Sequence, residues 1–122
     1  MAFAIRDCVE IAKAHGVEIT ASTLCGGGAK SPLWRKILAN VLGIPLTLPQ
    51  TEQGPGYGGA MLAAVACGAY PDVRSCAEAL VRAKQTTEPD AALVAKYNAR
   101  YAVWRKLYPA LKASFAEMEA LV

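Results

Sequence analysis

Histidine is almost absent from this sequence, and its cysteines are not paired. The 122 residues include one histidine, His15, and four cysteines that form no CxxC pair. A zinc centre is therefore not expected, because zinc sites need several such ligands at short spacings. No serine or cysteine has a second histidine to act as its base, which disfavours nucleophilic catalysis of that kind. Each cysteine lies in an apolar segment, so we expect all four to be buried, reduced and structural.

Long apolar runs and strong charge are also lacking. No run approaches the ~18 apolar residues of a membrane span, and the charges within MAFAIRDCVE disfavour a signal peptide. Thirteen basic and ten acidic residues give a formal net charge of +3. The densest basic group, at Lys30, Arg35 and Lys36, is too sparse for a nucleic-acid footprint. We expect a cytoplasmic protein with no membrane partner and no nucleic-acid partner.

Apolar residues are abundant, at 54% of the chain, and predict a folded domain. Residues 2–15 carry apolar side chains at helical spacing and predict a helix that buries Ile5, Cys8, Val9 and Ala12. The β-branched segment 17–25 predicts a strand. A second helix is expected over 32–42, and a short strand over 44–49. The alternation favours an α/β fold with parallel strands.

The second half of the chain is expected to be mainly helical. A helix over about 57–67 has three glycines in or beside its first turn, which calls for close approach of a sheet, a helix or a ligand. A shorter helix follows, with Asp72 as its N-cap, and then residues 84–90 form a surface connection. Asp90 is a second plausible N-cap, for a long C-terminal helix.

An apolar stripe runs along that C-terminal helix. Its members alternate by three and four residues: Val94, Tyr97, Tyr101, Trp104, Tyr108, Leu111, Phe115, Met118 and Val122. We favour a terminal helix packed on its own domain, and the alternative is a coiled coil with a partner helix. Pro109 is expected to kink or break the helix near Tyr108.

Chemical signals converge in the segment TLCGGGAKSP, residues 23–32. A predicted strand ends in three glycines, and Ser31 and Pro32 then start a helix. Exposed amides and a helix N-terminus favour an anion such as a phosphate. The Walker A motif fails at Leu24 and Ala29, and the dinucleotide fingerprint fails at Ser31. From these residues alone, a phosphate loop and a tight packing turn both remain open.

The carboxylates elsewhere in the chain give little sign of a catalytic site. The spacing of Asp7 and Glu10 allows a pair on one helix face, but nearby basic residues favour a solvated face. Glu52 lies in a loop near the glycine-rich helix, where it contacts either a ligand or nothing. We therefore name no catalytic residue and no metal ligand.

Three segments together carry a resemblance to a known family. They are GGGAKSPLWRKILANVLGIPL, TEQGPGYGGAMLAAVACGAYPDV and, after EPD, YNARYAVWRKLYPALK. In this order they resemble the C-terminal end of FGGY-family carbohydrate kinases, in particular the bacterial xylulokinases. The resemblance runs from the first helix to about Lys112.

The resemblance implies a ribonuclease-H-like, actin-type ATPase fold in two domains, with the nucleotide between them. It also implies transfer of the γ-phosphoryl group from ATP, with Mg²⁺, to a sugar hydroxyl, that of D-xylulose in xylulokinases. Matched by position, the nucleotide contacts are Gly26, Gly27, Gly28, Ala29, Lys30 and Ser31. The glycine-rich helix would pack beside this loop.

The family's phosphate-contacting start motif, most of its sugar pocket and its catalytic aspartate have no counterpart here. We expect residues 1–122 to form a single partial domain, the C-terminal portion of the nucleotide-binding second domain, helix-rich with a short parallel sheet. Such a chain should be inactive alone and form a homodimer or larger assembly through an exposed sheet edge. The alternatives are a non-catalytic interaction module that uses the aromatic C-terminal helix, and a degenerate nucleotide binder.

Overall fold

The structure, a computed structural model, describes residues 1–51 and 54–121. Glu52 and Val122, which the sequence analysis considered, lie outside the described residues. In chain order the elements are α1 (Ala2–Ala14), β1 (Ser22–Thr23), the 3₁₀ turn η1 (Gly27–Lys30), α2 (Pro32–Leu42), β2 (Leu46–Pro49), α3 (Gly54–Ala66), α4 (Val73–Leu80), β3 (Ala83–Thr87), α5 (Ala91–Trp104) and α6 (Leu107–Glu119). None of the described helices is long and apolar enough to cross a bilayer.

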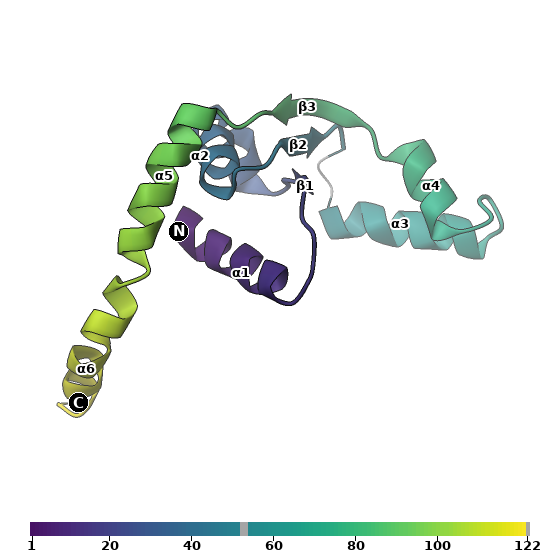
Figure 1. Cartoon of the computed structure of the whole chain (residues 1–122). Helices are drawn as coiled ribbons and strands as arrows, with labels where there is room; N and C mark the ends of the chain where they lie inside the picture. Colours follow the sequence, from purple (N-terminus) through teal and green to yellow (C-terminus); the bar gives the residue numbers. More distant parts are fainter. Residues whose placement is uncertain (52–53, 122) are drawn as a thin grey trace.

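The three strands form one mixed sheet in the order β1-β2-β3 (Figure 1). β1 and β2 are parallel, with Ser22 opposite Leu46, which agrees with the expected α/β alternation. β3 is antiparallel to β2, with Leu46 opposite Thr87. The prediction of a surface connection over 84–90 is therefore wrong for residues up to Thr87. β3 carries mostly exposed polar side chains and pairs through its backbone, so it shows no apolar alternation in the sequence.

The first strand is much shorter than the sequence suggested. Of the predicted segment 17–25, only Ser22 and Thr23 form a strand. Pairing with β2 ends when the N–H of Leu24 donates to the carbonyl of Thr47 at 2.9 Å, just before the glycines begin. β1 is therefore a short edge strand that delivers the chain to the glycine-rich segment.

The main core lies between α2 and β2. Its buried members are Leu38, Ala39, Ile44 and Leu46, and Val41 is also buried. The helix predicted over 32–42 is confirmed, and its Leu38 and Val41 are almost fully enclosed. The start signals are confirmed too, because the Ser31 hydroxyl accepts a hydrogen bond from the N–H of Trp34 at 3.2 Å.

The first helix turns a different face inward from the one expected. Ile5 is 38% exposed and Cys8 is exposed, so the predicted apolar face is wrong at these positions. Instead the Phe3 ring contacts three aromatic rings of α5, at centroid distances of 5.6 to 6.3 Å. The aromatic surface of α5 therefore sets the orientation of α1, and it does so through a face that carries charged residues.

The cysteines are less buried than predicted. Cys76 is fully buried in α4, whereas Cys8, Cys25 and Cys67 are exposed. All four are free thiols. The expectation of four buried cysteines is therefore wrong for Cys8, Cys25 and Cys67. Leu24, next to Cys25, packs against the core, whereas Cys25 itself is exposed.

The helices α3 and α4 pack on each other at one end of the molecule (Figure 1). The Tyr57 hydroxyl donates to the carbonyl of Leu80 at 3.1 Å. Asp72 caps α4 as predicted, since its carboxylate accepts from the N–H of Ser75 at 2.7 Å. This capping bond lowers the pKa of Asp72 below its usual value.

The glycines of α3 do not show the close approach that their positions suggested. A Cβ atom placed on Gly56, Gly58 or Gly59 would meet nothing within 4 Å among the described residues. A packing partner for this face of α3 is therefore absent from the described part of the chain.

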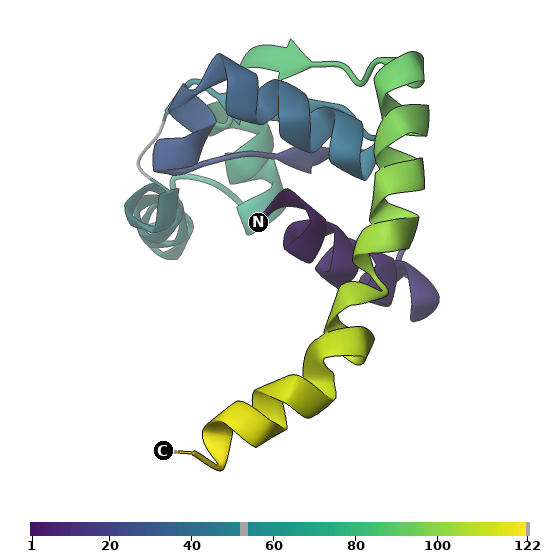
Figure 2. The same cartoon turned by 90° about the vertical axis from the view of Figure 1, so that its left-hand side faces the viewer.

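The C-terminal stripe extends from the sheet in two helices (Figure 2). Asp90 caps α5 as predicted, accepting from the N–H of Leu93 at 3.0 Å. The helix breaks at residues 105–106, and Pro109 lies in the first turn of α6. The predicted break is confirmed, because Pro109 has no N–H to bond the carbonyl of Arg105.

Candidate functional site

The glycine loop, residues Gly26–Ser31, connects β1 to α2. It leaves the sheet at the carboxyl end of the parallel strand pair, the edge at which ligands bind in open α/β sheets. Gly26 has a φ of 85°, a conformation that side chains rarely allow. The predicted strand, glycine turn and capped helix are thus all present in that order.

The backbone of the glycine loop is arranged as one 3₁₀ turn. The N–H of Ala29 donates to the carbonyl of Gly26, and that of Ser31 to Gly28, both at 3.1 Å. The first N–H groups of such a turn, on Gly27 and Gly28, have no partner within it. Both residues are exposed. With the N-terminus of α2 beginning immediately afterwards, this is the geometry of an anion-binding cradle.

The Gly28 position lacks room for a side chain. A Cβ atom there would lie 3.1 Å from both Cδ1 and Nε1 of the Trp34 indole. Trp34 is half-buried on the first turn of α2. The indole therefore supports the loop from one side, and any substitution at Gly28 requires it to move.

Arg35 contacts the same loop from inside the protein. Its side chain is buried, and its Nη1 donates to the carbonyl of Ala29 at 2.6 Å. The predicted basic group of Lys30, Arg35 and Lys36 is therefore not a surface cluster, because Arg35 faces the interior between the loop and β3. Sequence reasoning missed this role, since a lone arginine on an amphipathic helix gives no signal of burial.

All six predicted site residues lie in this single loop. Ala29 is 2% exposed, so it contributes backbone rather than side chain to any ligand site. Lys30 and Ser31 are exposed at the end of the loop. Among residues 1–51 and 54–121, no group of three His, Cys, Asp or Glu side chains is placed to hold a metal ion.

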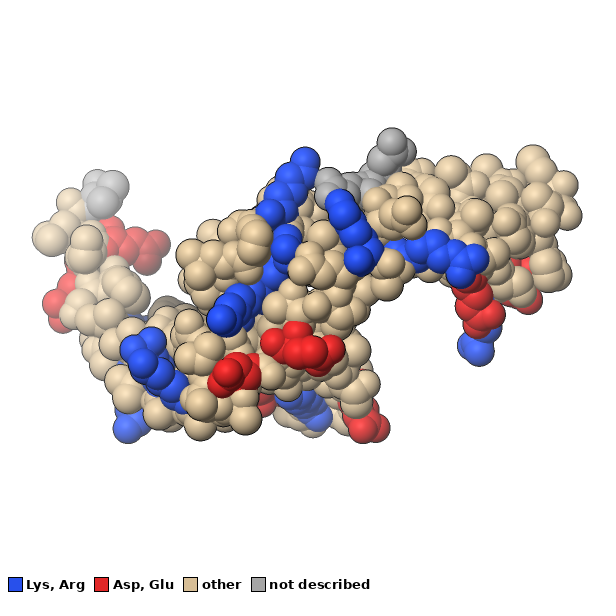
Figure 3. All heavy atoms as spheres, turned by 90° about the horizontal axis from the view of Figure 1, so that it is seen from above, with Lys and Arg blue, Asp and Glu red and all other residues tan. Residues whose placement is uncertain are grey.

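Lys and Arg side chains cross the middle of the face seen from above, and Asp and Glu side chains lie below them and toward both ends of the molecule (Figure 3). Charges of both signs are therefore present on this face. Positive charge near the sheet raises the local concentration of anionic ligands.

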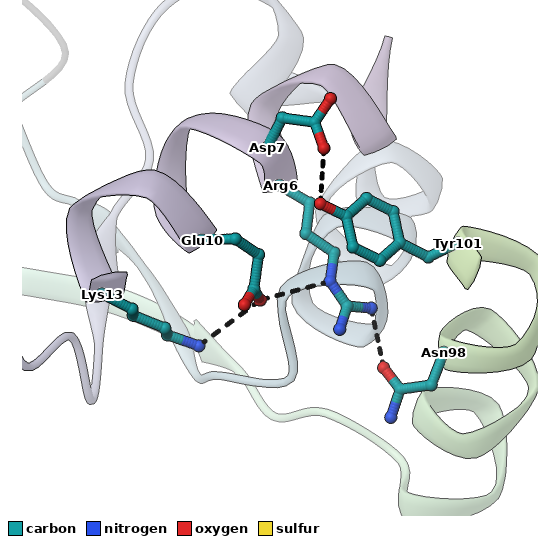
Figure 4. Close-up of polar contacts among 6 residues, drawn as sticks. All are labelled: Arg6, Asp7, Glu10, Lys13, Asn98 and Tyr101. Atoms are coloured by element: carbon teal, nitrogen blue, oxygen red, sulfur yellow. Dashed lines mark hydrogen bonds and ion pairs between the residues drawn. The ribbon is translucent and has the colours of Figure 1, made fainter. Parts of the chain in front are cut away.

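The predicted solvated carboxylates of α1 instead belong to a network between α1 and α5 (Figure 4). The Tyr101 hydroxyl donates to Asp7, and the Arg6 guanidinium lies 4.2 Å from the centre of the Tyr101 ring. Arg6 also pairs with Glu10 at 3.4 Å and donates to Asn98 at 2.7 Å. Burial and the Asp7 carboxylate raise the pKa of Tyr101 to about 12. These contacts join two helices, and none of them reaches the glycine loop.

A groove of about 850 Å³ lies beside this network, between α1 and the α5–α6 bend. Its lining includes Tyr101, Trp104, Tyr108 and Phe115, together with the carboxylates of Asp7 and Glu10. None of its lining residues belongs to the glycine loop. The groove and the loop are therefore separate features.

Comparison with known proteins decides the family. Residues 1–67, which include the whole glycine loop, match the C-terminal domain of the FGGY family of carbohydrate kinases. This chain belongs to the FGGY family. The resemblance noted in the sequence is thereby confirmed.

Individual relatives agree with this FGGY assignment. A xylulose kinase of Staphylococcus epidermidis is 29% identical over 95% of this chain and 23% of its own length. An autoinducer-2 kinase of Yersinia enterocolitica is 35% identical over 81% of this chain and 19% of its own length. The solved gluconate kinase of Lactobacillus acidophilus superposes with a TM-score of 0.88 at 21% identity, over 96% of this chain and 24% of its own.

The chain therefore spans less than a quarter of the length of the relatives that it matches. Its fold is that of the matching part of these kinases, a helix-rich portion of the ribonuclease-H-like, actin-type fold. The expected fold class is confirmed, with the sheet mixed rather than wholly parallel.

Proposed function

We propose that this chain is the C-terminal portion of the nucleotide-binding domain of an FGGY sugar kinase, and that it forms part of the ATP site. The observation that carries the proposal is the glycine loop, which joins a parallel strand to a capped helix and presents unpaired amides. The proposed contacts are Gly26, Gly27, Gly28, Ala29, Lys30 and Ser31. Family membership, with residues 1–67 matched, supports the same assignment.

The loop fits a nucleotide phosphate better than it fits a metal ion. Its donors are backbone N–H groups, and the Gly28 position excludes side chains that would fill the cradle. No carboxylate of the described residues lies in the loop. When bound, ATP would supply the transferable phosphoryl group, and Mg²⁺ would neutralise phosphate charge. This chain's part is to bind and orient the nucleotide.

A pentulose such as D-xylulose is the proposed acceptor in the whole enzyme. Xylulose kinases of Staphylococcus epidermidis and Bacillus subtilis both match, each at 29% identity. The autoinducer-2 kinase of Yersinia enterocolitica matches at 35% over a shorter stretch. The xylulose kinases support a pentulose as the phosphoryl acceptor. The match to the autoinducer-2 kinase makes autoinducer-2 the alternative acceptor.

Catalysis by this chain alone is not expected. Phosphoryl transfer depends on holding both substrates in line and neutralising charge, and the chain offers only one loop for this. We predict no ADP production when the purified chain is given ATP, Mg²⁺ and D-xylulose. Sustained production of ADP that depends on xylulose would overturn this part of the proposal.

Nucleotide binding can be tested at Gly28. We expect ATP binding, measured by titration calorimetry, to be lost in Gly28→Asp, which places a carboxylate in the cradle and against Trp34. Gly28→Asn has nearly the same volume without the charge, so it should weaken binding less. Ala102→Asp, on the exposed side of α5, adds the same charge elsewhere and should leave binding unchanged. Equal affinity in Gly28→Asp and the parent chain would refute the assignment of the loop.

A second candidate function is favoured by the exposed half of the C-terminal stripe. Tyr108 is 64% exposed, Phe115 49% and Met118 66%, all on α6. Large apolar patches of this kind are typical of protein interaction sites. If the parent chain is folded and does not bind ATP, a non-catalytic interaction module that uses this helix becomes the better description.

We also propose that the chain self-associates through the free side of β1. Among the described strands β1 pairs only with β2, so its other edge offers backbone groups that no described strand pairs with. Light scattering should show a homodimer or larger species whose fraction rises with concentration. A strictly monomeric chain at high concentration would contradict this proposal.

A further inference from the structure

Arg35 is a buried charge with neutral partners. It is 8% exposed, although arginine is rarely buried without a carboxylate beside it. The ion pairs found among the described residues, Arg6–Glu10 and Lys13–Glu10, do not include it. Its guanidinium instead lies between α2, the glycine loop and β3.

Each end of the guanidinium group is bonded to a different element. Nη1 donates to the carbonyl of Ala29 in the glycine loop at 2.6 Å. Nη2 donates to Oε1 of Gln85 on β3 at 3.2 Å. Nε is buried and has no hydrogen-bond partner within the described part of the chain. The planar group thus bridges the loop and the strand, which are far apart in sequence.

The carbonyl of Ala29 needs such a partner. It lies near the end of the 3₁₀ turn, where carbonyl groups find no N–H donor within the turn. Ala29 is also only 2% exposed, so water has little access to this carbonyl. A charged donor gives a shorter and stronger bond than a neutral one. The planar fork of the guanidinium donates to both Ala29 and Gln85 in a fixed geometry, whereas a lysine ammonium is a single point charge on a flexible stem.

We propose that Arg35 is a positioning residue for the glycine loop, and that Gln85 orients it from β3. By fixing the carbonyl of Ala29, Arg35 holds the 3₁₀ turn in which the amides of Gly27 and Gly28 face outward. Its charge is not neutralised by a carboxylate among the described residues, so it also favours an anion at the loop. The effect of Arg35 on ligand binding rests on the proposed nucleotide site. Its effect on the conformation of the loop does not.

The first experiment measures amide hydrogen exchange in the chain without nucleotide. In Arg35→Met, hydrogen exchange of the Ala29 and Ser31 amides should become about tenfold faster or more. The reason is that the hydrogen bond from Arg35 to the Ala29 carbonyl no longer opposes opening of the loop. Arg35→Lys, which keeps the charge, should give an intermediate increase. Lys36→Met removes a charge from the exposed neighbouring position and should change nothing.

The Gln85→Ala variant tests whether Gln85 acts on the loop through Arg35 or only contributes to packing. It should raise loop exchange severalfold in the parent chain and add nothing in the Arg35→Met background, because Gln85 acts through Arg35. If Arg35→Met unfolds the whole chain, the Gln85→Ala variant decides the matter. Unchanged exchange at residues 29 and 31 in Gln85→Ala would then overturn the proposal, as it would in a folded Arg35→Met.

A nucleotide titration separates this proposal from the assignment of the site. Where the parent chain binds ATP, Arg35→Met should weaken binding about tenfold while Lys36→Met does not. Unchanged ATP affinity in a folded Arg35→Met would overturn the positioning role at the ligand. A parent chain without ATP affinity refutes the nucleotide site, whereas faster loop exchange in Arg35→Met would still support the control of the loop by Arg35.

Discussion

The two halves of the C-terminal stripe have the same spacing but different surroundings. In α5, Tyr101 is 6% exposed, and Tyr97 and Trp104 are half-buried beside α1. In α6, Tyr108 and Phe115 contact each other at a centroid distance of 6.3 Å but stay largely exposed. The same pattern of apolar residues is therefore a core in one helix and a surface in the next.

The difference in burial comes from the elements that each helix contacts. α5 lies against α1 and α2, and Tyr101 forms a hydrogen bond and a cation–π contact there. α6 begins after the break at residues 105–106 and extends away from the sheet (Figure 2). Helical periodicity shows which side of a helix is apolar, but the covering surface depends on residues far away in the sequence.

The largest contrast should appear when one tyrosine of each half is truncated. Tyr101→Ala should lower the free energy of unfolding by about 3–5 kcal/mol, because a buried ring and its contacts are lost. Tyr108→Ala, the matched change at a 64% exposed ring, should cost under about 1 kcal/mol. Denaturant titration measures both. Equal losses would show that α6 is covered as well as α5.

A smaller effect should follow from removing only the Tyr101 hydroxyl. Tyr101→Phe keeps the ring but leaves Asp7 without this donor, which should cost about 1–2 kcal/mol at neutral pH. Denaturant titration of the parent chain and the variant provides the measurement.

The same hydroxyl makes stability depend on pH. The pKa of Tyr101 is raised from 10.0 to about 12 in the folded chain. A raised folded pKa means that the stabilisation is complete below pH 10 and is lost as the pH rises from 10 to 12. Tyr101→Phe should remove this part of the loss. A parent chain and variant with parallel curves over this range would contradict the role of the Tyr101 proton.

The caps of the two helices give a third contrast. Asp90 accepts from Leu93 at the start of α5, whereas Lys106 at the start of α6 makes no side-chain capping bond. Asp90→Ala should therefore cost about 1 kcal/mol, and Lys106→Ala should cost close to nothing. Chemical denaturation followed by circular dichroism distinguishes these values. A cost for Lys106→Ala equal to that for Asp90→Ala would show that capping does not distinguish the helices.

The sequence was informative where local chemistry determines structure. The caps at Ser31, Asp72 and Asp90 and the break before Pro109 depend on neighbouring residues, and all four were predicted. β3 was missed because exposed polar strands have no apolar period.

The candidate site divides in the same way. The glycine loop follows from its own residues, as a strand end, three glycines and a capped helix. Arg35 and Gln85 are 50 positions apart and meet only in the folded chain. A solvated arginine and a buried one have the same place in a helical pattern, so their contact with the loop was not predictable from spacing.

A small effect on stability should also come from changing Pro109, which lies just after the break between the two halves. Pro109→Ala restores an N–H that can donate to the carbonyl of Arg105, so α5 and α6 should join into a more continuous helix. Helical content measured by circular dichroism should rise, while the free energy of unfolding changes by under about 1 kcal/mol because α6 has few contacts to lose. Pro32→Ala is the control, since its N–H at the first position of α2 would have no helical partner. Unchanged helicity in Pro109→Ala would mean that the break, and with it the exposure of the α6 stripe, is set by something other than the proline.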